Sequence, residues 1–152
     1  MIRRRNFITI LGGAAAWPLA VSAQQRERMR RIGVLVAGVE TSPNVPAFVQ
    51  ALADLGWTDG RNVRMDLRWG GGDINRIRAL AQELVGPQPD IILADSTPTT
   101  AALQRETRTI PIVFAGVADP VASGFVERLD RPGENITGFA TNEAFPGRQV
   151  AS

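Results

Sequence analysis

Short apolar runs alternate along this chain with segments of helical periodicity, and this alternation is the strongest constraint on its fold. Residues 32–37, 90–94 and 110–115 are apolar almost throughout, which is typical of strands buried on both faces of a sheet. Residues 63–69 instead alternate between apolar and charged side chains, which predicts a half-exposed edge strand. Residues 136–139 form a shorter run, so we expect about five strands.

The segments between these runs predict helices, mostly because their apolar residues recur every three or four positions. We expect helices at residues 46–55, 74–85, 97–106 and 123–129. Asp73 and Thr97 stand where helix caps are expected, and Pro98 suits a first helical position. The alternation of strand and helix therefore predicts an α/β fold, with a parallel sheet and helices on both faces.

Four residue types that carry much of enzyme chemistry are missing from the chain. It contains no His, no Cys, no Tyr and no Lys, so all 17 basic residues are Arg. Imidazole, thiolate and Schiff-base lysine chemistry are thereby excluded from this chain, as are zinc, haem and iron–sulfur sites with His or Cys ligands. We expect no metal and no cofactor, although carboxylate-only sites for magnesium or calcium stay open.

The charge balance argues against a nucleic-acid partner. Arg3, Arg4 and Arg5 lie in the N-terminal segment, and without that segment the chain has 14 basic and 15 acidic residues. Proteins that bind nucleic acid usually carry a strong basic patch, which this balance does not favour.

Residues 1–23 have the order of an export signal: a basic start, an apolar stretch, and small residues before a cleavage site after Ala23. Arg4-Arg5-Asn6-Phe7-Ile8 resembles the twin-arginine export motif, with general secretory export as the alternative. The apolar stretch is shorter than the roughly 20 residues that span a bilayer. We therefore expect a periplasmic protein that does not span the membrane after cleavage and that begins with a polar leader, residues 24–31. An uncleaved amphipathic helix is the other interpretation.

Ligands of open parallel sheets bind beyond the carboxyl ends of the strands. The relevant loops here, after the first, third and fourth strands, are residues 39–44, 95–99 and 116–121. Free N–H groups at helix starts favour an anionic group such as a carboxylate there. The candidate ligand-binding residues in these loops are Ser42, Ser96, Thr97, Gly116 and Asp119. Helix capping by Ser42 and Thr97 and turn formation by Asp119 are the alternative interpretations.

Other motifs in the sequence are weak. Gly70-Gly71-Gly72-Asp73 lacks the lysine and the spacing of a phosphate-binding loop. Ser96 has no imidazole or lysine in the chain to activate it as a nucleophile.

Several segments taken together resemble a large bacterial group of ABC transporter substrate-binding proteins. They are residues 4–20 in the leader and residues 32–35, 55–63, 80–85, 109–114, 119–121 and 131–138 in the mature part. The resemblance implies a periplasmic-binding-protein fold of type I, in which two α/β lobes hold a ligand between them. Residues 32–141 correspond to the N-terminal lobe alone, and residues 142–152 are expected to be an irregular tail.

The resemblance also carries expectations about function. It implies a receptor without enzymatic activity or cofactor, whose partners are a small-molecule ligand and the ABC permease subunits of the inner membrane. Some relatives are associated with aromatic amino acids such as tryptophan or tyrosine. In the family's pattern, ligand contacts fall on the loops after the first, third and fourth strands, which again selects Ser42, Ser96, Thr97, Gly116 and Asp119.

The departure from the family lies at the C-terminus, where the family continues past Thr141 into a second lobe. We therefore expect a truncated form of the substrate-binding component of an importer, with an amino acid as a candidate ligand. Two alternatives stay open: a small exported α/β hydrolase-like enzyme that uses carboxylates or a divalent ion, and a non-functional fragment.

Overall fold

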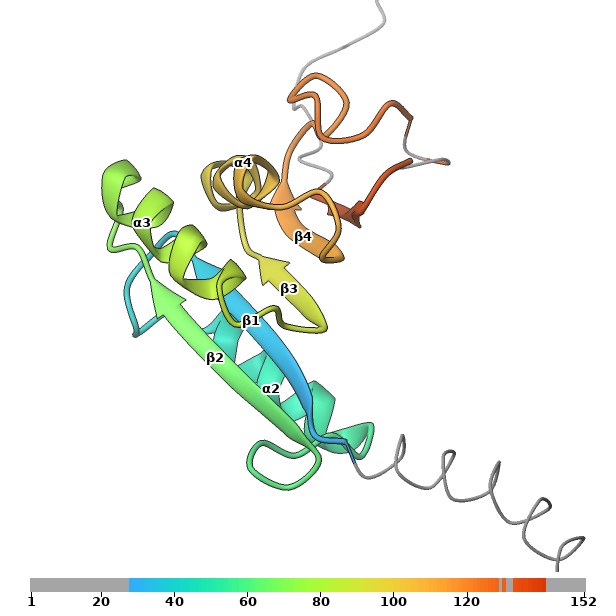
Figure 1. Ribbon diagram of the computed structural model, residues 1–152. Coiled ribbons are helices and arrows are strands. Elements are labelled where there is room, and N and C mark those ends of the chain that lie inside the picture. Colours follow the sequence, from blue (N-terminus) through green and yellow to red (C-terminus); the bar gives the residue numbers. More distant parts are fainter. Residues whose placement is uncertain (1–27, 129, 131–132, 142–152) are drawn as a thin grey trace, which may run out of the picture.

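The computed structural model describes residues 28–128, 130 and 133–141, which form one parallel sheet with helices on both faces (Figure 1). The strand order is β2-β1-β3-β4-β5, and all four neighbouring pairs are parallel. The strands are β1 (Arg30–Val36), β2 (Val63–Trp69), β3 (Ile91–Ala94), β4 (Ile112–Val117) and β5 (Ile136–Ala140). The expected fold class is therefore confirmed, and β2 lies at an edge as its alternating pattern predicted.

The three described helices divide unequally between the two faces of the sheet. Helices α3 (Ile74–Val85) and α4 (Thr97–Glu106) pack side by side in front of the sheet, and α2 (Asn44–Asp54) lies behind it (Figure 1). Right-handed crossovers explain this division: the connection from β1 to β2 runs one way along the sheet, whereas the next two run the other way.

The core lies between the sheet and the α3–α4 layer. Alternate strand residues, among them Leu35, Ile92 and Phe114, form one buried cluster with the inward stripe of α3. That stripe is Ile77, Ala81 and Leu84. The helix begins where Asp73 accepts hydrogen bonds from the N–H groups of Asn75 and Arg76, at 2.8 and 3.2 Å. This cap confirms the sequence prediction for Asp73.

Helix α2 covers its face of the sheet incompletely. None of its residues is buried, although Phe48 and Leu52 are partly covered. On the same side of the sheet, Val113 and Ala115 of β4 are only half-buried, and the side chain of Phe139 in β5 is 77% exposed. The α2 side of the sheet is therefore apolar but partly open within the described part of the chain.

The predicted helix at residues 123–129 is wrong for the residues that the structure describes. Residues 120–124 form turns, in which the Ser123 N–H donates to the Asp119 carbonyl and Gly124 has a φ of +74°. Gly124 lies within the predicted helix, and its positive φ is incompatible with helical backbone. The connection from β4 to β5 therefore contains no helix among its described residues, which breaks the expected alternation.

Three smaller predictions also need correction. Thr97 is the first residue of α4 and not its cap, which is Ser96. Strand β4 lies two residues later than predicted because Pro111, which has no N–H to donate, precedes it, and β1 begins two residues earlier, at Arg30. The predicted signal segment and the predicted tail lie outside the described residues. None of the helices in the described part is long and apolar enough to cross a membrane.

Candidate functional site

Because all five strands are parallel, the loops that follow them meet at one edge of the sheet. The loops after β1 and β2 are joined directly: the Gly71 N–H donates to the Gly38 carbonyl at 2.9 Å, and the Gly72 N–H donates to the Ala37 carbonyl at 2.8 Å. The loops after β1 and β3 are joined through Asp95, whose Oδ1 accepts the Ala37 N–H at 2.9 Å. This edge is therefore a connected layer of loops.

A cavity of about 450 Å³ opens at this edge, on the α2 side of the sheet. Its floor is apolar and comes mainly from strand side chains, among them Val34, Leu93 and Val113. Its polar lining residues are Ser42, Asn44, Asp95 and Thr141, together with the backbone of Gly116. The size and the apolar floor with a few polar groups match the usual properties of small-molecule sites.

Two of the five predicted site residues, Ser42 and Gly116, line this cavity. Ser42 is not a helix cap, because α2 begins at Asn44 and Pro43 holds the cap position. Gly116 has a φ of +70°, and a Cβ at this position would lie 2.5 Å from the Asp95 carbonyl oxygen. The loops after β3 and β4 thus approach so closely that only glycine fits, which is a structural reason for this residue.

Ser96 and Thr97 lie at the start of α4 but do not line the cavity. The Ser96 N–H donates to Oγ1 of Thr99 at 3.1 Å, and the two hydroxyl oxygens are also 3.1 Å apart. The hydroxyls of the buried Thr99 and Thr100 both donate to the Ser96 carbonyl, at 2.9 and 2.7 Å. Ser96 is therefore largely engaged in building the helix start, whereas Thr97 is exposed beside it.

Asp119 is exposed and lies apart from the cavity lining. Its Oδ1 accepts the Ala122 N–H at 2.9 Å, which closes the turn after β4. The turn-forming interpretation of Asp119 thus has a direct structural basis. The sequence reasoning did not select Asn44, Asp95 or Thr141 as site residues; their signal was position alone, since Asp95 and Thr141 directly follow strands that share this edge.

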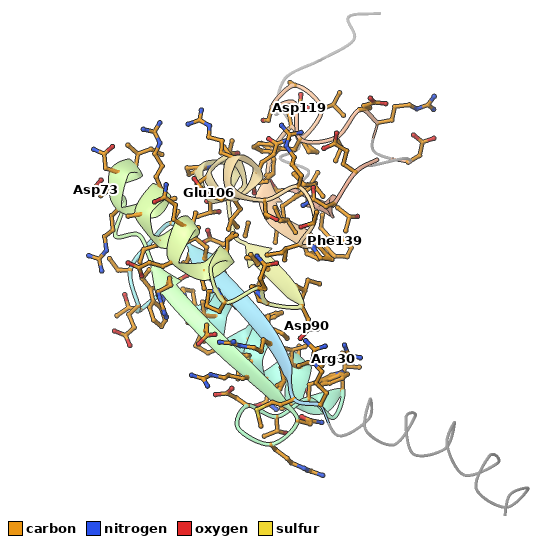
Figure 2. All side chains as sticks on the ribbon, viewed as in Figure 1. Arg30, Asp73, Asp90, Glu106, Asp119 and Phe139 are labelled. Atoms are coloured by element: carbon orange, nitrogen blue, oxygen red, sulfur yellow. The ribbon has the colours of Figure 1, made fainter. Side chains whose placement is uncertain are left out.

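The opposite end of the sheet carries a second carboxylate with a different environment. Asp90 precedes β3 and lies beside Arg30, away from Asp73 at the carboxyl edge (Figure 2). The Arg31 N–H donates to its Oδ2 at 2.8 Å, and the guanidinium groups of Arg28 and Arg30 lie 3.8 and 3.4 Å from its Oδ1. The Arg31 backbone hydrogen bond lowers the pKa of Asp90, and the two guanidinium groups add to this effect against the opposing effect of burial.

This second end anchors the start of β1 to the start of β3 and offers a smaller cavity of about 290 Å³ beside Trp57 and Leu52.

Among the described residues, no group of three or more acidic residues is arranged to hold a metal ion. The polar groups that line the cavity of about 450 Å³ at the carboxyl edge are hydroxyl, amide, carboxylate and backbone groups. Groups of these kinds bind ligands by hydrogen bonding and charge.

Residues 32–150 match the family described as ABC transporter substrate binding protein. The chain belongs to this family. It is 33% identical over 114 residues to the tyrosine-binding protein of Clostridioides difficile, an alignment that covers 74% of this chain and 33% of the relative.

Solved structures of similar proteins agree with the fold. The ligand-free, open structure of a substrate-binding protein with adhesive properties from Clostridium difficile has a TM-score of 0.68 at 33% identity. The structure of an ABC domain from Streptococcus pneumoniae in complex with L-Trp has a TM-score of 0.67 at 26% identity. Both comparisons cover 74% of this chain and 39% of the solved chain, so the chain spans between a third and two fifths of these relatives.

Proposed function

We propose that this chain belongs to the receptor of an ABC-type importer and contributes one side of the site that captures an amino acid, with tyrosine and tryptophan as the first candidates. The observation that carries the proposal is the cavity at the carboxyl edge, which combines an apolar floor with hydroxyl, amide and carboxylate groups. An aromatic amino acid has the matching parts, an apolar ring and two charged groups. The name of the Clostridioides difficile relative and the L-Trp complex support the same ligand class.

The five residues predicted from the sequence have different roles in this proposal. Ser42 and Gly116 contribute to the cavity wall. Ser96 and Thr97 hold the start of α4, where the Thr97 N–H and the helix dipole favour a ligand carboxylate. Asp119 shapes the loop after β4 through its turn.

The cellular setting follows from the family and the N-terminal sequence. We propose export through the twin-arginine-like signal of residues 1–23, residence in the periplasm, and delivery of the ligand to permease subunits in the inner membrane. The function is binding rather than catalysis, in line with the substrate-binding relatives. A single lobe covers one side of a ligand, so we expect weak binding by residues 24–152 alone.

A titration followed by NMR tests this proposal. Addition of tyrosine or tryptophan to ¹⁵N-labelled residues 24–152 should shift the amide signals of residues 39–44, 95–97 and 116–117, whereas glutamate should not. Ser42→Ala should weaken the effect, and Thr58→Ala, in an exposed turn away from the cavity, should not. Shifts confined to the cavity beside Trp57, or no shifts at all, would contradict the proposal.

A further inference from the structure

The cavity of about 450 Å³ at the carboxyl edge has a single ionisable group in its lining. Of its thirteen lining residues, eight are apolar, four are polar but uncharged or glycine, and one is a carboxylate, Asp95. The cavity therefore presents one negative charge against a predominantly apolar surface. A ligand with a positive group and an apolar body fits this arrangement better than a purely anionic one does.

Asp95 is held in place through one side of its carboxylate. Its Oδ1 accepts the Ala37 N–H at 2.9 Å, which joins the side chain to the loop after β1. The Thr99 hydroxyl lies 3.4 Å from the same oxygen but donates its one proton to the Ser96 carbonyl, at 2.9 Å. No described residue donates a hydrogen bond to its Oδ2. This oxygen is nevertheless not buried, so solvent or a ligand can reach it. One oxygen thus positions the group, and the other remains accessible.

The contrast with Asp90 shows what is missing around Asp95. Both carboxylates adjoin β3, but Asp90 forms ion pairs with Arg28 and Arg30, whereas Asp95 forms none with the described residues. A carboxylate beside apolar surface is stabilised when a cation donates hydrogen bonds to it. The part of the chain described here supplies no such cation, which leaves the charge of Asp95 available to a cationic group of a ligand.

We propose that Asp95 receives the ammonium group of the ligand and so selects amine-bearing ligands over otherwise identical acids. This inference rests on the proposed function and adds to it the residue that reads the amine. At the start of α4, which directly follows Asp95, the Thr97 N–H has no partner among the described residues and can donate to the carboxylate of the same ligand. The apolar side chain then lies against the strand residues of the cavity floor.

The Asp95→Asn variant tests this assignment, because an amide oxygen can still accept the Ala37 N–H while the charge is removed. Dissociation constants for tyrosine and for 3-(4-hydroxyphenyl)propionate, which lacks the amine, should be measured by NMR on residues 24–152. We expect the variant to bind tyrosine about tenfold more weakly and the acid equally well or more tightly. The Asp90→Asn variant, changed at the other end of β3, should bind both as the natural chain does.

The possible results separate the two proposals. If the natural chain binds neither compound, the proposed function fails and this inference fails with it. If the natural chain binds tyrosine and Asp95→Asn weakens both compounds equally, or neither, only the assignment of Asp95 is overturned. Thermal unfolding of both variants shows whether weaker binding follows from a loss of folding, and an unfolded Asp95→Asn chain is replaced by Asp95→Ser, for which the same selective loss is expected.

Discussion

The two carboxylates that flank β3 show how local partners decide what one residue type does. Asp90 is surrounded by backbone N–H and guanidinium donors and joins the starts of β1 and β3. Asp95 uses one oxygen to join the ends of the same strands, and its other oxygen accepts no hydrogen bond from the described residues. The same residue type is thus a structural anchor at the amino edge and a candidate recognition group at the carboxyl edge.

The lowered pKa of Asp90 predicts how stability depends on pH. Because this pKa lies below the usual value of 3.8, the ionised carboxylate contributes stability that is complete above that value and is lost as the pH falls through the folded-state pKa. We expect Asp90→Asn to lower the free energy of unfolding at about pH 7, and the difference from the natural chain to disappear below the folded-state pKa. Urea unfolding of both proteins from about pH 7 to about pH 3 measures this, and a difference that grows on acidification would contradict it.

Residue-level prediction from the sequence succeeded where local chemistry decides the outcome. Asp73 caps its helix as expected, because a cap depends only on its neighbours. The prediction of Thr97 as a cap was wrong by one residue, because Ser96, the hydroxyl residue before it, holds the cap position. Sequence reasoning also could not find Asn44 or Thr141, because their approach to Asp95 depends on how separate loops pack.

At the scale of elements, α3 and α2 differ in how firmly they hold the sheet. Helix α3 buries three residues against the sheet, whereas α2 buries none. The amphipathic pattern of both segments is visible in the sequence, but the pattern says only which side faces the protein. The extent to which that side of the helix is buried depends on the neighbouring elements that pack against it.

This difference predicts unequal costs for the same substitution in the two helices. Leu84→Ala removes a fully buried side chain from α3 and should lower the free energy of unfolding by about 3 kcal/mol. Leu52→Ala changes a partly covered side chain of α2 and should cost less than about half of that. Urea unfolding followed by circular dichroism measures both values. Equal losses would show that α2 contributes as much to the packed core as α3 does.

The strands and the three described helices follow from patterns that the sequence displays, but the strand order and the connection from β4 to β5 do not. Continuous apolar runs indicate buried strands, and right-handed crossovers then fix the sides on which helices lie. Residues 123–129 were expected to be helical, yet residues 120–124 form turns and Phe125 and Val126 are buried in the core without forming a helix. Which backbone conformation brings these two apolar residues into the core depends on tertiary packing.

At the scale of the whole molecule, helices α3 and α4 cover one face of the sheet, whereas α2 leaves the other face partly open. The face toward α3 and α4 carries the buried cluster, whereas the face toward α2 carries the larger cavity and the exposed side chain of Phe139. Known relatives are two and a half to three times as long as the part that matches this chain. The apolar surface that forms the floor of the candidate site is thus only partly covered in the described part of the chain.

If the α2 side of the sheet is open, substitution by Ser should have opposite effects on dye binding at Phe139 and at Phe114, although the two residues belong to neighbouring strands. Phe139→Ser should change the free energy of unfolding by less than about 1 kcal/mol, because its ring is 77% exposed. It should also reduce the fluorescence of the dye ANS bound to residues 24–152, since the dye binds accessible apolar surface. Phe114→Ser, at a buried position on the other face, should cost about 3–5 kcal/mol and increase dye binding as packing loosens. Chemical unfolding and dye titration of the two variants decide the matter. A large loss of stability in Phe139→Ser would mean that this ring is covered in solution, and then the α2 side of the sheet would not be open to a ligand.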